Sequence, residues 1–292
     1  MTVPLALGEV MENRTTTFAQ TADFASRAER LGLDSIWVFD HLLWRFEGEP
    51  DEGPHEAWTT LSALTPVVPR VELGALVMCS SFRNAGLMAK MAATLDDLSG
   101  GRLILGIGCG WHEPEYDAFG LPFDHLVGRF EEDLEVVARL LRGETVDYNG
   151  RWSRYSRAVL LPPPSRRPPI LVASKGERML RLTATWADAW NTAWFGSVDA
   201  MLRERIRGLD GALDALGRDR GAIRRTVGIR LHEPGQRGDD KRSTDADARG
   251  LADLFDELES TGFADTIVWA TAKTPVALER IGRARELHLA HR

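Results

Sequence analysis

Eight predicted strands, each followed by a predicted helix, indicate an α/β fold, a (β/α)8 TIM barrel with an excursion after the fourth helix. Two further observations favour this barrel over a doubly wound open sheet, which is the alternative. The 292 residues suit a barrel that folds as a unit, so we treat 1–292 as one barrel domain. The turn after the first strand, Gly8-Glu9-Val10-Met11, also lacks the phosphate-binding pattern of open dinucleotide-binding sheets.

The predicted strands are short apolar runs bounded by turn residues. They cover 3–9, 35–39, 71–78, 103–109, 170–173, 188–193, 225–232 and 265–270. The predicted helices cover 16–31, 56–68, 85–98, 124–141, 177–185, 198–216, 248–261 and 275–287. Between the fourth helix and the fifth strand, 144–155 is expected to form a hairpin around Asn149-Gly150, and a proline-rich tract follows at 162–169. Polar loops at 42–55, 114–125 and 235–247 are expected to shape a pocket.

Composition and charge exclude several classes of function. A net charge of −7 does not favour binding to nucleic acid or to an anionic membrane surface. No apolar run is long enough to span a bilayer, and two cysteines do not make a disulfide framework. We therefore expect a cytoplasmic enzyme that acts on a small molecule and has neither a nucleic acid nor a membrane as partner.

The apolar strand at 35–39 ends in two adjacent ionisable residues, Asp40 and His41. In a barrel, the C-terminal ends of the strands carry the functional residues. A histidine beside a carboxylate can orient a ligand, move a proton or bind a metal, whereas a polar cap on a strand would be a purely structural role. The barrel setting favours the functional interpretation. Glu9 and Glu56 are weaker candidates for an acid or base.

Two glycine-containing segments end other predicted strands. In Gly106-Ile107-Gly108-Cys109-Gly110-Trp111 the alternating glycines would let a flat ligand approach the backbone, or would only relieve crowding inside the barrel. Ser174-Lys175-Gly176-Glu177 opens a helix, whose backbone N–H groups can bind an anion or simply be capped.

Other chemistries have weaker support. The residues His41, His55, His112, Glu115 and Asp40 could ligate a metal, but the His-x-His of metal-dependent barrel hydrolases is missing, so no metal is expected. A Gly-x-Ser-x-Gly nucleophile elbow is also missing. The tryptophans Trp44, Trp58, Trp111 and Trp194 lie nearer the predicted ligand-binding end and could wall a pocket for a flat ring.

Several longer segments together resemble one known family. They are 28–41 (AERLGLDSIWVFDH), 56–61 (EAWTTL), 73–83 (LGALVMCSSFR), 89–102 (AKMAATLDDLSGGR), 105–112 (LGIGCGWH) and 176–182 (GERMLRL). In combination they resemble the luciferase-like monooxygenase superfamily, and within it the coenzyme F420-dependent branch. The resemblance is continuous over 18–194 and looser over 265–285. It implies a barrel that binds a flavin or deazaflavin ring and that often forms a homodimer.

The resemblance also implies roles for individual residues. Asp40 and His41 would lie against the ring system, with His41 orienting the ring or exchanging a proton with the substrate. The strand end at Leu76, Val77, Met78 and Cys79 would back the ring, often through a non-prolyl cis peptide. The ring's side would be lined by Gly108, Cys109, Gly110 and Trp111. The cofactor phosphate would be held by Ala173, Ser174, Lys175 and Gly176, in a loop one residue tighter than is common in the family.

The expected function is that of an F420-dependent oxidoreductase, which transfers a hydride between the deazaflavin and a small organic substrate. The catalytic candidates are His41, Asp40 and Glu56. One alternative keeps the barrel and uses FMN to activate oxygen, as a monooxygenase does. A second alternative is a barrel that binds the cofactor without catalysis.

Overall fold

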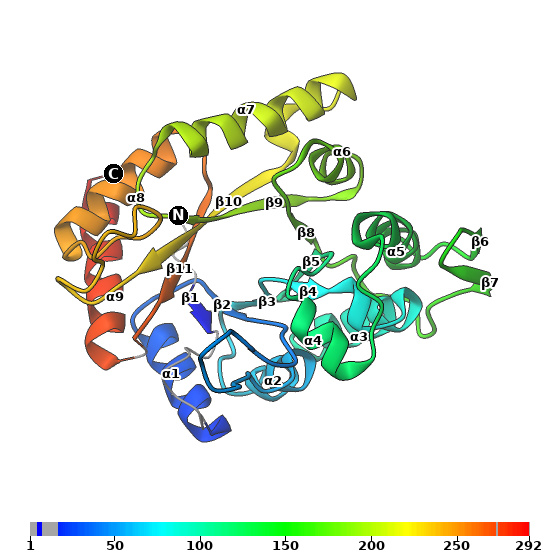
Figure 1. Cartoon of the computed structure of the whole chain (residues 1–292), viewed down its shortest axis with the longest axis horizontal. Coiled ribbons are helices and arrows are strands. Elements are labelled where there is room, and N and C mark those ends of the chain that lie inside the picture. Colours follow the sequence, from blue (N-terminus) through cyan, green and yellow to red (C-terminus); the bar gives the residue numbers. More distant parts are fainter. Residues whose placement is uncertain (1–4, 8–16, 273, 292) are drawn as a thin grey trace.

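A computed structural model of the chain describes residues 5–7, 17–272 and 274–291, and in these residues the predicted parallel barrel is confirmed (Figure 1). Its strands, in chain order, are β1 (Leu5–Leu7), β2 (Ser35–Val38), β3 (Glu72–Ala75), β5 (Leu103–Gly108), β8 (Ile170–Ala173), β9 (Ala189–Phe195), β10 (Arg224–Leu231) and β11 (Asp265–Ala270). Each pairs in parallel with the next, and pairing of β11 with β1 closes the ring. Of the first predicted strand, 3–4 and 8–9 lie outside the described residues.

Helices cover the outside of the barrel in the predicted order. They are α1 (Phe18–Arg30), α2 (Ala57–Leu64), α3 (Ala85–Leu98), α5 (Leu126–Leu141), α6 (Glu177–Trp186), α7 (Ala200–Ala215), α8 (Ala248–Ser260) and α9 (Pro275–Ala290). Several start at a capping side chain that accepts from a free backbone N–H, such as Asp199 before α7 and Thr274 before α9. Among the described helices, none is long and apolar enough to cross a bilayer.

The third predicted strand, 71–78, is divided in the structure. After β3 the Leu76–Val77 peptide bond is cis, and the chain then forms β4 (Met78–Cys79), which pairs with β5. The non-prolyl cis peptide expected from the family resemblance is therefore present at this position. A second one, at Ala193–Trp194 in β9, was not expected from the sequence.

One predicted loop is wrong in part. The segment 114–125 was expected to be a loop, but α4 (Glu113–Phe119) occupies its first half, directly after β5. Pro114 near the start of α4 and Gly120 at its end, with φ of 68°, are ordinary helix-boundary residues. Their spacing encloses only two turns, too short for a periodic apolar pattern to show.

The predicted hairpin after α5 is confirmed as β6 (Val146–Asn149) and β7 (Arg154–Ala158), an antiparallel pair that projects from the barrel (Figure 1). A two-stranded hairpin is marginal by itself, so it needs anchors. The buried Glu132 carboxylate of α5 supplies one, since it accepts from the backbone N–H groups of Arg151, Trp152 and Ser153 at 2.7–3.0 Å.

Asp133, the next residue of α5, lies beside this anchor and carries a pH-dependent part of the stability. Burial is the main cause that raises the pKa of Asp133, to about 6. The folded state therefore holds this proton more tightly than the unfolded state, so stability falls as pH rises from about 4 to about 6. We expect Asp133→Asn, which mimics the protonated form, to raise the unfolding free energy by about 2 kcal/mol at pH 7.5.

Urea unfolding at pH 7.5 and at pH 4 measures this effect. At pH 4 the Asp133→Asn variant and the wild type are expected to be equally stable. The matched change at the exposed Asp97, Asp97→Asn, should have no comparable effect at either pH. A wild type that is as stable as Asp133→Asn at pH 7.5 would show that the Asp133 carboxylate is not penalised by the fold.

The core has two layers, one inside the barrel and one between the strands and the helices. The barrel interior is filled by Trp37, Phe39, Ile104, Leu171, Ala189 and Ile267, with Leu76, Val77, Trp194 and Trp269 packed against them. Gly106 and Gly108 of β5 fit within this packing. A Cβ at Gly106 would lie 2.0 Å from the Ala75 carbonyl oxygen, and one at Gly108 would lie 2.7 Å from Val77 Cγ2. These glycines make room for the β3–β4 segment, which agrees with the crowding-relief alternative.

Candidate functional site

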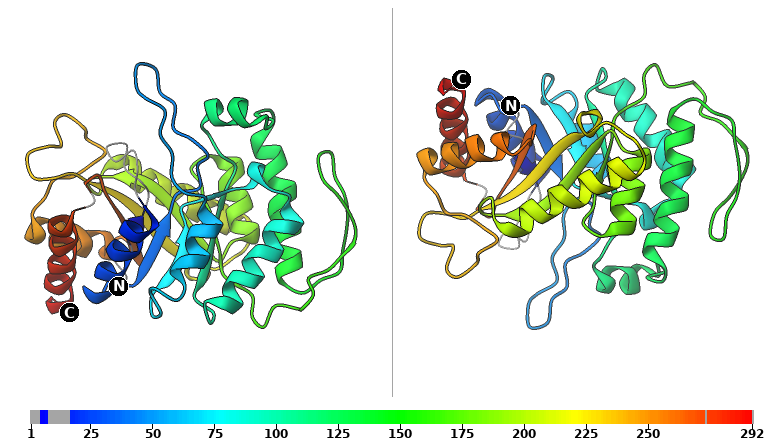
Figure 2. Two further views of the ribbon diagram at one scale, coloured as in Figure 1. Left: turned by 90° about the horizontal axis from the view of Figure 1, so that it is seen from below. Right: turned by 90° about the horizontal axis from the view of Figure 1, so that it is seen from above.

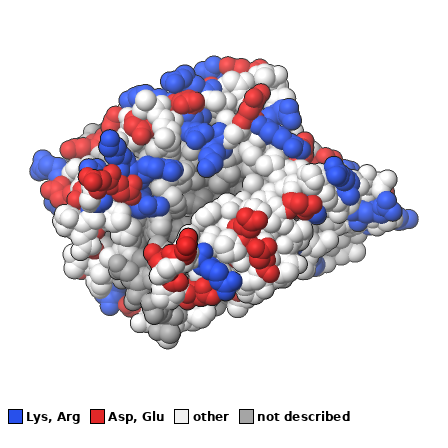
Figure 3. All heavy atoms as spheres, in the orientation of Figure 1, with Lys and Arg blue, Asp and Glu red and all other residues white. Residues whose placement is uncertain are grey.

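The segments that follow β2, β5 and β10 leave the barrel at the same end, which we call the mouth. Figure 2 shows the loop 42–55, α4 and the segment 232–247 projecting there together. Figure 3 shows that the face seen in Figure 1 is hollowed, with Lys and Arg side chains along the upper side of the hollow. Most of the predicted site residues lie at this end. Glu9 falls outside the described residues.

At the mouth, the His41 side chain is hydrogen-bonded to the carboxylate of Glu115 in α4. The Nδ1 atom of His41 lies 2.9 Å and 3.2 Å from the two carboxylate oxygens of Glu115, and one of these, Oε2, also accepts from the backbone N–H of Leu42 at 2.8 Å. The side chains are 12% and 1% exposed, so the pair is nearly shielded from water. A carboxylate at Nδ1 fixes the tautomer of His41, with its proton on Nδ1 and Nε2 left as an acceptor.

Asp40 points away from His41 and into a different network. Its carboxylate forms a two-fold ion pair with Arg83, at 2.6 Å and 2.9 Å, and accepts from the backbone N–H of Cys79 at 2.8 Å. Arg83 also donates a hydrogen bond to the Glu56 carboxylate, at 2.7 Å. The network ties the end of β2 to β4, directly after the cis Leu76–Val77 peptide bond. The buried Asp40 carboxylate is thus both paired with a cation and hydrogen-bonded, which is the condition under which buried charges are tolerated.

Glu56 accepts hydrogen bonds from backbone groups as well as from Arg83. It caps α2, where its side chain accepts from the backbone N–H groups of Trp58 and Thr59 at 3.1 Å and 2.7 Å. Partial burial acts to raise the pKa of Glu56, but the hydrogen bonds from Thr59, Arg83 and Trp58 outweigh it and hold the pKa below its usual value. Glu56 is therefore a carboxylate at neutral pH and a weak proton donor.

Cys79 ends β4 and Cys109 follows the neighbouring β5, and neither is positioned as a nucleophile. Cys79 Sγ lies 3.0 Å from the Tyr116 hydroxyl, which donates to the Cys109 carbonyl oxygen at 3.1 Å. Burial raises the pKa of Cys79 to about 12 and also raises that of Cys109. Both are therefore thiols at neutral pH. Gly110, with φ of 81°, leaves the room that Tyr116 occupies, since a Cβ there would lie 1.8 Å from the Tyr116 hydroxyl.

The predicted phosphate loop follows β8 and differs from expectation at Ser174. The Ser174 hydroxyl is buried and bonded to Thr183 Oγ1 at 2.8 Å, so it faces the core of the protein. Lys175 is exposed, and its carbonyl oxygen accepts from Arg205 at 2.7 Å. Gly176 starts α6 without a side-chain cap, and a Cβ built there would meet nothing within 4 Å. The α6 N-terminus is thus open, with uncapped N–H groups.

Aromatic side chains form the floor and one wall of the mouth. Phe39, Trp194 and Trp269 pack edge to face or tilted, with centroids 5.2–6.1 Å apart, at the top of the barrel interior. On one side the Trp44 ring lies 3.7 Å from the His41 ring, and Trp111 is 5.7 Å from His41 and 59% exposed. These surfaces suit a flat ligand. Trp58, expected near the mouth, instead packs in the layer between strands and helices.

His112 lies within this aromatic wall, and a hydrogen bond determines which of its ring nitrogens is unprotonated. Its Nε2 accepts from the backbone N–H of Arg45 at 3.1 Å, which requires that nitrogen to be unprotonated. Burial lowers the pKa of His112, with the nearby Glu115 acting in the opposite direction. Although His41, His112 and Glu115 lie near one another, no grouping of three or more side chains in the described part of the chain has metal-ligand geometry.

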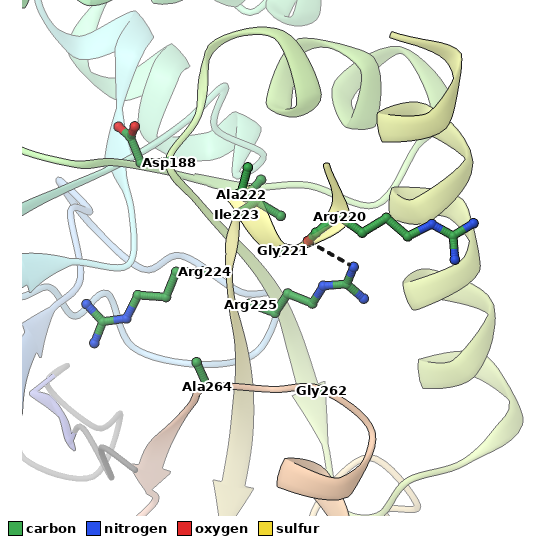
Figure 4. A pocket seen from close by; sticks show the side chains of 9 residues that line it. All are labelled: Asp188, Arg220, Gly221, Ala222, Ile223, Arg224, Arg225, Gly262 and Ala264. Atoms are coloured by element: carbon green, nitrogen blue, oxygen red, sulfur yellow. Dashed lines mark hydrogen bonds between the residues drawn. The ribbon is translucent and has the colours of Figure 1, made fainter. Parts of the chain in front are cut away.

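The opposite end of the barrel contains an open depression of about 660 Å³, shown in Figure 4. It is lined by Asp188, Arg220, Gly221, Ala222, Ile223, Arg224, Arg225, Gly262 and Ala264. Its three arginines are paired within the protein: Arg224 with Asp265 and Glu72, Arg225 with Asp210, and Arg220 with Asp214. Arginines that are already ion-paired contribute to the stability of the fold and are not available to bind a ligand. Stability is the usual role of residues at the N-terminal end of a barrel.

Comparison with known proteins identifies the family. A family model described as luciferase-like monooxygenase matches residues 4–233. The chain belongs to the luciferase-like monooxygenase family. As a luciferase-like protein it is an oxidoreductase, and its barrel mouth is the end at which the family resemblance placed the cofactor.

One sequence relative and two solved structures show which kinds of enzyme this chain is similar to. An F420-dependent glucose-6-phosphate dehydrogenase of Kineococcus radiotolerans is 30% identical over 275 residues, which cover 90% of this chain and 80% of that protein. The structure of an F420-dependent tetrahydromethanopterin reductase from Methanopyrus kandleri covers 99% of both chains, with a TM-score of 0.80 and 17% identity. An EDTA monooxygenase from a Chelativorans species gives a TM-score of 0.82 at 16% identity, over 100% of this chain and 94% of that one. Reductases and monooxygenases thus share this fold, so the fold alone does not select the reaction.

The structure also brings in residues that the sequence reasoning did not select. Glu115 was considered only as a metal ligand, and Arg83, Tyr116 and Arg230 were not considered. The sequence held one usable signal, since Arg230 stands between the apolar residues Ile229 and Leu231 near the end of a predicted strand that leads to the mouth. The sequence held no such signal for Glu115, because its position beside His41 depends on α4 folding back toward β2.

Proposed function

We propose that this luciferase-like protein is an F420-dependent oxidoreductase that transfers a hydride between the deazaflavin and a small organic substrate. The observation that carries the choice of cofactor is the relationship over 90% of the chain to an enzyme named as F420-dependent. Two features of the mouth support it: the shielded His41–Glu115 pair beside an aromatic surface, and the open N-terminus of α6.

The residues at the mouth fit the phosphate and the flat ring of such a cofactor. The phosphate would meet the uncapped N–H groups at the start of α6 and the ammonium group of Lys175, and Ser174 would contribute only backbone atoms. The ring would lie between the wall that contains His41 and Trp111 and the segment at Leu76 and Val77. When bound, the deazaflavin supplies a ring carbon that accepts or donates a hydride.

In this proposal His41 is the catalytic acid or base. Hydride removal from an alcohol releases a proton from its hydroxyl group, and hydride addition to a carbonyl needs a proton on the oxygen. With Nδ1 directed to Glu115, His41 has Nε2 available to take or return that proton. The Glu115 carboxylate orients the imidazole and stabilises its protonated form. Asp40 is a positioning residue that acts through Arg83, and Glu56 anchors Arg83.

Titration of the purified chain with F420 and with FMN, followed by the absorbance and fluorescence of each cofactor, tests the proposal. We expect saturable binding of F420 that is tighter than that of FMN. Lys175→Met is expected to weaken F420 binding roughly threefold to tenfold, by loss of one charge-assisted contact, while the phosphate-free deazaflavin riboside is unaffected.

Lys241→Met, the same change at another exposed lysine, is the matched control and should bind F420 as the wild type does. Tight binding of FMN with no response to F420 would contradict the proposal and favour the FMN-dependent monooxygenase. Binding of F420 without any hydride transfer to a broad panel of alcohols and carbonyl compounds would favour the non-catalytic barrel.

A further inference from the structure

Arg230 is a cation that faces the interior of the barrel mouth. Residues alternate along β10: Val227 and Ile229 pack in the layer beneath the helices, whereas a Cβ on Gly228 would lie 2.7 Å from the Trp194 ring. Arg230 is therefore on the interior side, as Gly228 is. It is paired in register with Trp269 of β11, and its guanidinium carbon lies 4.8 Å from the centre of the Trp269 ring. Its side chain is 32% exposed, so it is accessible from the hollow at the mouth.

Three buried donors lie together at the ends of β10 and β11, and none of them has a hydrogen-bond acceptor among the residues that the structure describes. They are Arg230 Nε, Trp269 Nε1 and His232 Nε2, the last of which carries the proton if Nδ1 accepts from Thr271. A buried donor without a partner destabilises the fold, and several together in a native structure need an explanation.

The Asp240 carboxylate lies beside these donors but does not satisfy them. Asp240 Oδ2 lies 3.3 Å from Arg230 Nη1 and 3.8 Å from His232 Nε2, and it reaches neither Arg230 Nε nor Trp269 Nε1 within hydrogen-bond distance. One carboxylate at the edge of the cluster leaves most of its donor capacity unused. Stacking on an indole keeps the edge of a guanidinium free, and that edge binds a planar or tetrahedral oxyanion through two parallel hydrogen bonds.

We propose that Arg230, together with Trp269 and His232, binds an oxyanion group of the substrate, a carboxylate or a phosphate. The inference rests on the proposed function, because it assigns one end of the substrate that the mouth would present to the cofactor. The substrate class is then an organic acid or a phosphate ester that carries an alcohol or carbonyl group at some distance from its anionic end.

Other cations near the two ends of the barrel do not meet the same conditions. Arg280 of α9 also has unpartnered nitrogens, but Glu233, Asp245 and Asp247 compensate its charge. The arginines of the depression in Figure 4 form close ion pairs. Of these cations, Arg230 alone combines access from the mouth, an aromatic support and unused donors.

Calorimetric titration of the F420-saturated protein tests this inference, with benzoate and inorganic phosphate as anionic probes and benzamide as the neutral analogue of benzoate. We expect at least one anion to bind the wild type more tightly than benzamide, and Arg230→Met to weaken that anion about tenfold or more while leaving benzamide and F420 binding unchanged. Which anion responds distinguishes a carboxylate from a phosphate substrate. Asp240→Asn removes the competing carboxylate and is expected to strengthen anion binding severalfold.

Arg242→Met, an exposed arginine on the same segment, is the matched control and should bind both anions as the wild type does. Equal losses in Arg230→Met and Arg242→Met, or no anion binding to the wild type at millimolar concentration, would overturn the inference. So would a loss of F420 affinity in Arg230→Met with anion binding unchanged. The same titrations without F420 separate the two proposals, because failure to bind F420 refutes the proposed function and leaves anion binding to be measured by itself. Asp240→Asn keeps the test decisive should Arg230→Met fold poorly.

Discussion

Glu115→Gln is expected to lower the rate of hydride transfer by about one to two orders of magnitude, with F420 affinity changed much less. Glutamine retains the shape of the side chain and can still accept from His41 Nδ1, but it carries no charge to stabilise the imidazolium that forms as the proton moves. His41→Ala removes the proton carrier itself and is expected to cost about two to three orders of magnitude. Single-turnover kinetics with bound F420 separate this effect from cofactor binding.

Two further variants show whether Glu115 acts through its charge. Glu113→Gln changes an exposed glutamate two residues away on α4 and should keep the wild-type rate. Glu115→Asp keeps the charge and should recover part of the rate lost in Glu115→Gln. If Glu115→Gln transferred hydride at the wild-type rate, or if Glu115→Asp were as slow as Glu115→Gln, the assigned role of Glu115 would be wrong.

Gly106→Ala is expected to destabilise the chain by about 3 kcal/mol or more, which is the largest stability effect predicted for a single methyl group here. The added Cβ would lie 2.0 Å from the Ala75 carbonyl oxygen, a backbone atom that cannot rotate away. Relief therefore requires β3 and β5 to separate just beyond the point where they pair in the barrel sheet. Thermal and urea unfolding measure the loss.

Gly211→Ala is the matched control for Gly106→Ala. Gly211 lies in α7, and a Cβ there would meet nothing within 4 Å. Alanine is the better helix former, so this variant is expected to be more stable by about 0.5–1 kcal/mol. A Gly106→Ala variant as stable as the wild type would show that the close approach of β3 and β5 is not needed for the stability of the barrel.

The sequence was sufficient for the order of elements because that order depends on local patterns. The bounds of α3, β8 and β11 follow the predicted 85–98, 170–173 and 265–270, where N-caps and turn glycines lie beside clear apolar runs. The division of the third predicted strand was not visible by the same reasoning. The cis Leu76–Val77 bond lies between its two parts; the family resemblance suggested this bond, and apolar periodicity could not.

The candidate site could be located from the sequence more easily than its roles could be assigned. Asp40 and His41 were selected as a pair because they are adjacent at a strand end, yet they face different partners, Arg83 and Glu115. Those partners lie 43 and 74 residues away, and only tertiary folding brings them together. The positions of the glycines in β5 and just after it could not be explained from the sequence either, because their neighbours Ala75, Val77 and Tyr116 come from other parts of the chain.

A crystal structure of the chain in complex with F420 is the most direct test of the proposed function. The account predicts the deazaflavin ring in the mouth, in contact with His41 and with the segment at Leu76–Val77, and the phosphate at the N-terminus of α6 beside Lys175. A ring bound away from His41, or a phosphate held elsewhere than at α6, would contradict it.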